Sequence, residues 1–131
     1  MMQSESNATI LLIDDAPEAI LVAAKQLSGL GELLAATCGA DGLRLARQAQ
    51  PDLILLDARM PDMDGLAVLA QLKADTATRD IPVIMVSADG GGAHCAAALA
   101  AGAADFVCKP PEPDVFRAHV LAQLQRRPAG T

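Results

Sequence analysis

This sequence of 131 residues is poor in aromatic side chains, with two phenylalanines and neither tryptophan nor tyrosine. A hydrophobic core must therefore be built from Leu, Ile, Val, Met and Ala, and hydrophobic residues reach 52% of the chain. Proteins that bind single-stranded nucleic acids stack the bases on aromatic faces. The scarcity of such faces argues against a base-stacking surface.

Basic residues are also few, with ten Lys and Arg against sixteen Asp and Glu and a net charge of −6. An acidic domain repels the phosphate backbone, so we expect no direct binding of nucleic acid. Clustered carboxylates suit a hard cation such as Mg²⁺ instead.

Cysteine is sparse and odd in number, and no CxxC pair occurs among Cys38, Cys95 and Cys108. A disulfide framework or zinc site is disfavoured, and a reducing compartment is expected. The first eight residues carry Glu5 and no basic residue, unlike a signal peptide. The Ala-rich run Cys95–Ala104 is too short to span a bilayer. We expect a cytoplasmic protein with no membrane contact.

Short and nearly continuous apolar runs indicate strands that are buried on both faces of a sheet. These runs are Thr9–Ile13, Leu33–Ala36, Leu53–Leu56, Val83–Val86 and Ala104–Val107. Amphipathic stretches with helical spacing lie between them. The first four are the stretch from Pro17 to the stop at Gly29, Asp41–Gln50, Gly65–Ala74 and Ala93–Ala101. The fifth starts near Glu112 and has apolar residues four positions apart at Phe116, Val120 and Leu124.

The alternation of five strands with five helices predicts an α/β domain, with a parallel sheet covered by helices on both faces. Its crossovers should be right-handed. The length suits one domain. We expect a folded domain over 9–126, a disordered N-terminus over 1–8, and a tail or the start of a linker over 127–131.

Polar side chains follow the predicted strands at the point where each strand ends. Asp14 and Asp15 follow the first strand, Asp57 the third, Ser87 the fourth, and Lys109 comes just after the fifth. The functional crevice of an open parallel sheet lies beyond the carboxyl ends of its strands. We therefore expect these five side chains to meet there.

This set of side chains has a clear chemical logic. Three neighbouring carboxylates repel one another unless a cation lies among them, and Mg²⁺ binds through a few carboxylates, waters and phosphate oxygens. One carboxylate can attack phosphorus and form an acyl phosphate. A metal ion and a lysine would neutralise the charge on the phosphoryl oxygens, and a serine hydroxyl would donate to one of them.

Four motifs in this order resemble the response-regulator receiver family from about Thr9 to Leu124. They are Leu12-Ile13-Asp14-Asp15, Asp57 within Leu55-Leu56-Asp57-Ala58-Arg59-Met60-Pro61-Asp62-Met63-Asp64-Gly65, Ser87-Ala88, and Phe106-Val107-Cys108-Lys109-Pro110. The resemblance implies a flavodoxin-like, doubly wound fold like that of the chemotaxis regulators, with a five-stranded parallel sheet of order 2-1-3-4-5 and five helices.

The resemblance also implies a role for each site residue. Asp57 would be the phosphoacceptor. Asp15 and Asp57 would bind Mg²⁺ directly with the backbone carbonyl of Arg59, while Asp14 would act through metal-bound water. Lys109 would pair with Asp57 and then with the phosphoryl group. Ser87 would bond a phosphoryl oxygen. Phe106 would turn inward as a switch. A cis peptide bond between Lys109 and Pro110 belongs to the same pattern.

Such a domain would be a signalling switch of a two-component system, not an enzyme beyond its own phosphotransfer and autodephosphorylation. Its partners would be a sensor histidine kinase or phosphotransfer protein and an output domain or partner protein, controlled through the face of the fourth helix, fifth strand and fifth helix. The same face would suit a homodimer. The segments Ile81–Ala88 and Lys109–Pro113 look like those of receivers that precede cyclic-di-GMP domains.

Simpler interpretations exist for each residue taken singly. Asp14 and Asp15 suit a helix cap before Pro17, Ser87 a cap or turn, and Lys109 the surface. A small phosphatase with a transient aspartyl phosphate, or a module that acts without phosphorylation, are the rival functions. Asp62-Met63-Asp64-Gly65 resembles the nucleophile motif of haloacid-dehalogenase-type phosphatases, but no apolar strand precedes it, which favours a turn and a helix cap.

Overall fold

A computed structural model describes residues 8–60, 62–88, 92–109 and 112–126. Its elements in chain order are β1 (Thr9–Ile13), α1 (Pro17–Gln26), β2 (Glu32–Ala36), α2 (Gly39–Ala49), β3 (Leu53–Asp57), α3 (Gly65–Ala74), β4 (Val83–Ser87), α4 (Gly92–Ala100), β5 (Asp105–Cys108) and α5 (Pro113–Arg126). The predicted N-terminal and C-terminal segments fall outside this part at residues 1–7 and 127–131, as does the Lys109–Pro110 peptide bond. Ala8 is described and buried, and its carbonyl accepts the N–H of Glu32 at 2.8 Å.

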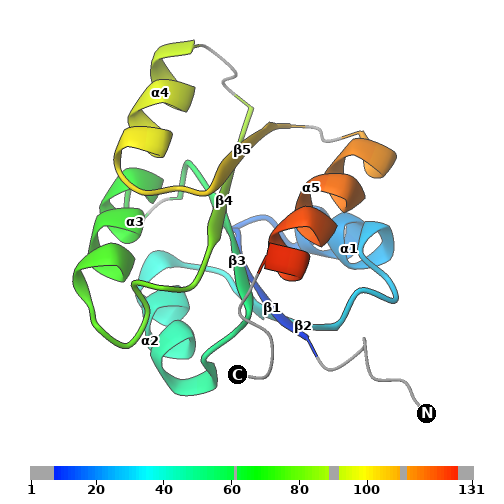
Figure 1. The fold of residues 1–131 in the computed structure, drawn as a ribbon, viewed down its shortest axis with the longest axis horizontal. Coiled ribbons are helices and arrows are strands. Elements are labelled where there is room, and N and C mark those ends of the chain that lie inside the picture. Colours follow the sequence, from blue (N-terminus) through cyan, green and yellow to red (C-terminus); the bar gives the residue numbers. More distant parts are fainter. Residues whose placement is uncertain (1–7, 61, 89–91, 110–111, 127–131) are drawn as a thin grey trace.

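The five strands form one parallel sheet in the order β2-β1-β3-β4-β5, which confirms the predicted fold. Helices α1 and α5 cover one face of the sheet, and α2, α3 and α4 cover the other (Figure 1). Because all strands run the same way, their carboxyl ends meet at one edge. Within the described ranges, no helix combines the length and the hydropathy needed to cross a bilayer.

Two clusters of aliphatic side chains hold the three layers together, one on each face of the sheet. Strand β3 shows why its sequence is continuously apolar: Leu53 and Leu55 join the cluster under α1 and α5, whereas Ile54 and Leu56 join the cluster under α2, α3 and α4. All four side chains are fully buried. The central strand is thus fixed from both sides up to Asp57, where its polar end begins.

Some element ends differ from the predicted ones. Helix α1 ends at Gln26, three residues before the predicted stop at Gly29, with Leu27 as its C-cap. Helix α2 begins at Gly39 and not at Asp41, because the Asp62 carboxylate accepts the first free N–H groups of the helix. Strand β5 lies one residue later than predicted, and the N–H of Ala104 instead bonds the carbonyl of Val83.

The turn before α3 is a helix cap, as the sequence indicated. Asp64 has extended backbone, and its carboxylate accepts the N–H of Leu66 at 3.1 Å. The N–H of Gly65 bonds the carbonyl of Ala58 at 3.0 Å, which folds the start of α3 onto the end of β3. A side chain at Gly65 would place its Cβ 2.7 Å from the Asp57 carbonyl oxygen and from the Ala58 Cα.

We expect Gly65→Ala to lower the free energy of unfolding by about 1–3 kcal/mol or more, because the obstructing atoms are backbone and cannot move aside as a flexible side chain would. Denaturant unfolding followed by circular dichroism measures this. Ala67→Ser, at an exposed position of the same helix, should change it by less than about 0.5 kcal/mol. Equal stability of Gly65→Ala and the wild type would contradict the close packing.

Candidate functional site

The predicted acidic residues converge at the carboxyl edge of the sheet. Asp14 and Asp15 follow β1, Asp57 ends β3, and carboxylate oxygens of all three lie within 4.8 Å of one another. The Lys109 Nζ, which follows β5, lies 2.9 Å from Asp14 Oδ2 and 3.4 Å from Asp57 Oδ1. Residues that are far apart in sequence thus form one charged cluster, as the parallel topology predicted.

Burial distinguishes the members of this cluster. Asp14, Asp57 and Ser87 are 3%, 7% and 2% exposed, whereas Asp15 lies on the surface. Ser87 ends β4, and its backbone carbonyl accepts the N–H of Lys109 at 2.7 Å. The same edge therefore holds the hydroxyl-bearing residue next to the lysine-bearing segment.

Asp14 is no helix cap. Its Oδ1 accepts the N–H of Ala16 at 3.0 Å, in the turn before α1, while its Oδ2 accepts a hydrogen bond from the Lys109 ammonium at 2.9 Å. The N-cap residue of α1 is Ala16, whose side chain makes no cap bond. The buried carboxylate of Asp14 is thus oriented by the backbone towards the cluster.

Lys109 is held more closely by Asp14 than by Asp57, which the sequence did not indicate. Burial lowers the pKa of the Lys109 ammonium, but the hydrogen bond and the charge of Asp14, followed by those of Asp57, outweigh it and raise the pKa above its usual 10.5. Lys109 is therefore charged at neutral pH, within reach of both buried carboxylates.

Asp57 is in the opposite situation. Burial and the negative charge of Asp14 raise its pKa above the usual value of 3.8. The charge of Lys109 and the N–H of Arg59, which lies 3.4 Å from Asp57 Oδ1, counteract this in part. The carboxylate of Asp57 is thus electrostatically strained when ionised, and an added cation would relieve it.

The donor set fits Mg²⁺. The three carboxylates of Asp14, Asp15 and Asp57 are hard oxygen ligands, the type that Mg²⁺ prefers. The exposed Asp15 leaves one side open to water and to phosphate oxygens, which Mg²⁺ commonly retains as ligands. One lysine against three carboxylates leaves the cluster negative by two charges, so the electrostatics also favour a divalent cation.

Arg59 adjoins this cluster, whereas Phe106 lies in the core. Arg59 is exposed and pairs with Asp64 across the loop after β3, in a short antiparallel bridge. Phe106 is half-buried, lies opposite Met85 in the register of β4 and β5, and packs against the cluster under α2, α3 and α4. Phe106 is thus a core residue in this structure.

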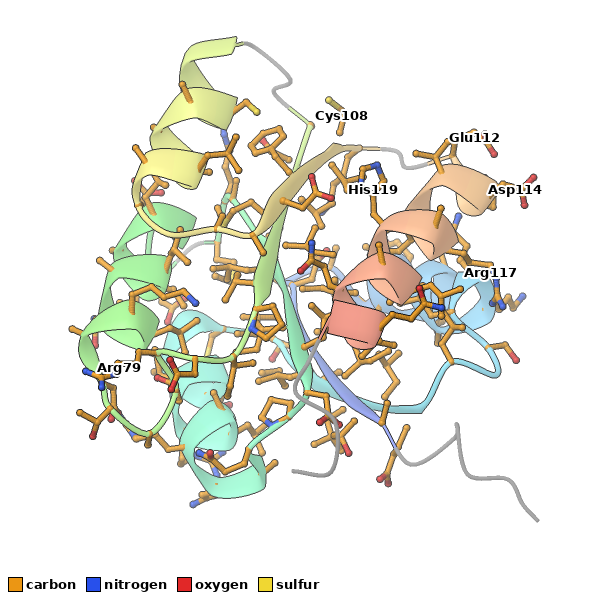
Figure 2. The ribbon with its side chains drawn as sticks, viewed as in Figure 1. Arg79, Cys108, Glu112, Asp114, Arg117 and His119 are labelled. Atoms are coloured by element: carbon orange, nitrogen blue, oxygen red, sulfur yellow. The ribbon has the colours of Figure 1, made fainter. Side chains whose placement is uncertain are left out.

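A cavity of about 410 Å³, which the sequence did not indicate, adjoins the acidic cluster between α1 and α5. Its lining is Leu12, Asp14, Glu18, Ala19, Val22, Ala23, Gln26, Asp57, Val86, Ala88, Lys109 and Phe116. Arg117 of α5 links the two helices, because its Nη1 donates to the backbone carbonyls of Gln26 and Ser28 at 2.9 Å each (Figure 2). A separation of about ninety residues hides this contact from local sequence patterns.

Known proteins share both the sequence pattern and the fold. The family model of the response regulator receiver domain matches residues 10–121. Response regulator PleD of Caulobacter vibrioides is 40% identical over 105 residues, which are 79% of this chain and 23% of PleD. Protein PilH of Pseudomonas aeruginosa is 34% identical over 118 residues, which are 89% of this chain and 98% of PilH. The chain thus spans about a quarter of the first relative and nearly all of the second.

Among solved structures, the receiver domain of Francisella response regulator 1452 superposes with a TM-score of 0.84 and 25% sequence identity. The superposition covers 92% of this chain and 98% of that domain.

We expect Asp57→Asn to raise the free energy of unfolding at pH 7 in the presence of a chelator by about 1 kcal/mol, the usual size of a single-residue effect. The variant removes a buried charge that burial and Asp14 disfavour, and Lys109 keeps its shorter bond to Asp14. Folded wild-type protein holds the Asp57 proton to higher pH than the unfolded chain does, so it loses stability as pH rises between the two pKa values. The advantage of the variant should therefore be small below about pH 4 and grow above it.

Urea unfolding followed by circular dichroism, over a series of pH values, measures this difference. Added Mg²⁺ is the internal control, because it should stabilise the wild type more than the variant. A variant that is less stable than the wild type in chelator at pH 7 would contradict the assigned electrostatics.

Proposed function

This chain belongs to the response regulator receiver family, and from that membership we propose that it is a phosphorylation switch with Asp57 as the phosphoacceptor. Members of the family are switches of two-component signalling systems. The observation that carries the proposal is the convergence of Asp14, Asp15, Asp57 and Lys109 at one edge of the sheet. A histidine kinase or phosphotransfer protein would supply the phosphoryl group.

In the proposed reaction, a carboxylate oxygen of Asp57 forms a bond to phosphorus while the bond from phosphorus to the donor's histidine nitrogen breaks. The product is an acyl phosphate on Asp57 and a free imidazole on the donor. Asp15, Asp57 and the Arg59 carbonyl would hold Mg²⁺ directly, and Asp14 would do so through water. Bound Mg²⁺ neutralises charge on the transferring group.

Lys109 is placed to act both before and after the phosphoryl transfer. Asp14 fixes its ammonium 3.4 Å from Asp57 Oδ1, so that it faces the acceptor before any phosphoryl group arrives. After transfer it would pair with a phosphoryl oxygen, with Asp14 still oriented by the N–H of Ala16. Ser87, which ends the neighbouring strand, would donate its hydroxyl to another phosphoryl oxygen.

The response would pass from Ser87 to Phe106 and on to the face of α4, β5 and α5. Phe106 lies one strand away from β4, opposite Met85, so a shift of Ser87 would act on the same pair of strands. The exposed apolar residues Leu99 of α4 and Val115 of α5 suit contact with an output domain, a partner protein or a second copy of the chain. PleD extends well beyond the matched part, which supports an output domain, whereas PilH is matched over 98% of its length, which supports a single-domain regulator.

Three further features belong to this proposal. The chain would catalyse no more than its own phosphotransfer and autodephosphorylation, and Arg59, two residues after the acceptor, would tune the second rate. It would act in the cytoplasm, where a reducing environment suits its free cysteines, Cys38, Cys95 and Cys108. It would contact neither nucleic acid nor membrane directly.

We expect acetyl phosphate with Mg²⁺ to convert the wild-type protein to a phosphorylated form that is retarded on a Phos-tag gel. Asp57→Asn should show no retarded band, because the amide is no nucleophile towards phosphorus. Chelation of Mg²⁺ should abolish labelling of the wild type. Asp52→Asn, which alters a carboxylate that accepts the N–H of Thr9 at the opposite end of the sheet, is the matched control and should be labelled like the wild type.

Labelling of Asp57→Asn at the wild-type level would refute the assignment of the acceptor. Labelling of the wild type without any divalent cation would refute the role of the metal.

A further inference from the structure

A contact that none of the assigned roles uses joins the loop after β3 to the start of α2. The Asp62 carboxylate accepts the N–H of Gly39 through Oδ1 at 3.0 Å and the N–H of Ala40 through Oδ2 at 3.2 Å. Asp62 lies in the segment between β3 and α3, whereas Gly39 and Ala40 form the first turn of α2. One side chain therefore ties two segments that are separated by more than twenty residues in sequence.

The tied segment is the one that follows the acceptor. Other residues of this segment already contact the start of α3. Arg59 pairs with Asp64, and the N–H of Gly65 bonds the Ala58 carbonyl. Asp64 caps the helix. Of the described residues in this stretch, Ala58 and Arg59 are thus tied to the start of α3, and Asp62 is tied to the start of α2. Arg59 lies three residues before Asp62 in the sequence.

The chemistry of the contact suits a carboxylate. Two free N–H groups and the positive end of the helix dipole favour a negative charge at the start of a helix. The N–H of Gly39, the strongest influence, and that of Ala40 lower the pKa of Asp62, so the group is ionised at neutral pH. The two N–H groups at the start of α2 thus stabilise the negative charge of Asp62.

Close packing supports the same junction. A Cβ at Gly39 would lie 2.9 Å from the Met63 Sδ and 3.0 Å from the Val68 Cγ2, so glycine lets the start of α2 approach the loop. The residue after Asp62 therefore packs on the turn that Asp62 itself caps. Asp62 and Met63 are therefore both in contact with the start of α2.

We propose that Asp62 is a positioning residue for the cation site: by fixing the loop after Asp57 to α2, it holds the Arg59 carbonyl in place for Mg²⁺. The inference rests on the proposed function, since it treats the acidic cluster as a Mg²⁺ site. A residue that only capped α2 would change the stability of the fold and leave the affinity for the cation as it is. The two roles therefore separate in a binding measurement.

The experiment compares Asp62→Ala, Asp62→Asn and the matched control Asp75→Ala in the full chain. Asp75 also accepts a backbone N–H, that of Ala77 at 2.9 Å, and pairs with Arg47, but it lies at the opposite end of α3. Backbone hydrogen bonds lower the pKa of both carboxyls. For each protein, Mg²⁺ is titrated while amide chemical shifts are followed by NMR, and thermal unfolding is measured in chelator.

We expect Asp62→Ala to weaken Mg²⁺ binding by about tenfold, the lower end of the range for residues that orient metal ligands. Asp62→Asn should weaken it less, because the amide keeps one acceptor for the two N–H groups. Asp75→Ala should lower the unfolding temperature and leave Mg²⁺ affinity at the wild-type value. Wild-type affinity in Asp62→Ala, or an equal loss in Asp75→Ala, would overturn the proposal.

The outcome separates this inference from the proposed function. A wild-type protein that binds no Mg²⁺ and takes no phosphoryl group would refute the function itself. A wild type that binds Mg²⁺ and is labelled by acetyl phosphate, beside an Asp62→Ala variant with equal affinity, would refute the role of Asp62 alone.

Discussion

Two buried carboxylates that share one lysine are the constraint on which this structure depends. Asp14 and Asp57 both lie almost fully buried, and burial together with the negative charge of Asp14 raises the cost of ionising Asp57. Lys109 relieves that repulsion only in part, because its shorter bond goes to Asp14. The fold thus maintains an excess of negative charge at a fixed point, and this excess is what makes the edge of the sheet receptive to a divalent cation.

The rest of the molecule keeps these charges together. Leucine and isoleucine side chains pack β3 from both faces up to Asp57, and the neighbouring strands β1 and β4 end at the same level. Hydrophobic burial is not directional, but here the buried strands β1, β3 and β4 all place polar residues at or just after their carboxyl ends. Loosening either aliphatic cluster would therefore change the distances between charges that the clusters do not contact.

Much of this arrangement follows from the sequence, because strand periodicity and topology are local or nearly local properties. The continuous apolar runs predict a parallel sheet, and a parallel sheet brings Asp14, Asp57 and Ser87 to one edge whatever the details of the helices. Partners within that edge are harder to predict. Whether Lys109 lies closer to Asp14 or to Asp57 depends on distances that differ by a few tenths of an ångström. Residue spacing in the sequence does not determine such differences.

Contacts between distant segments are also hidden from the sequence. Asp62 looked like part of a turn before α3, and its neighbour Asp64 does cap that helix, but the Asp62 carboxylate reaches back to Gly39. The predicted start of α2, Asp41, is two residues too late for the same reason, because the groups that cap this helix come from elsewhere in the chain. The hydrogen bonds of Arg117 and the cavity between α1 and α5 likewise form only when the two helices are packed side by side.

The division of the core by the sheet has a further consequence for how such a domain diversifies. The cavity beside Asp57 opens between α1 and α5, whereas Phe106 packs on the other side of the sheet, under α2, α3 and α4. Substitutions on one side need not disturb packing on the other, because the strands form a continuous partition between them. The packing beside the cavity and the packing around Phe106 can therefore vary independently of one another among such proteins.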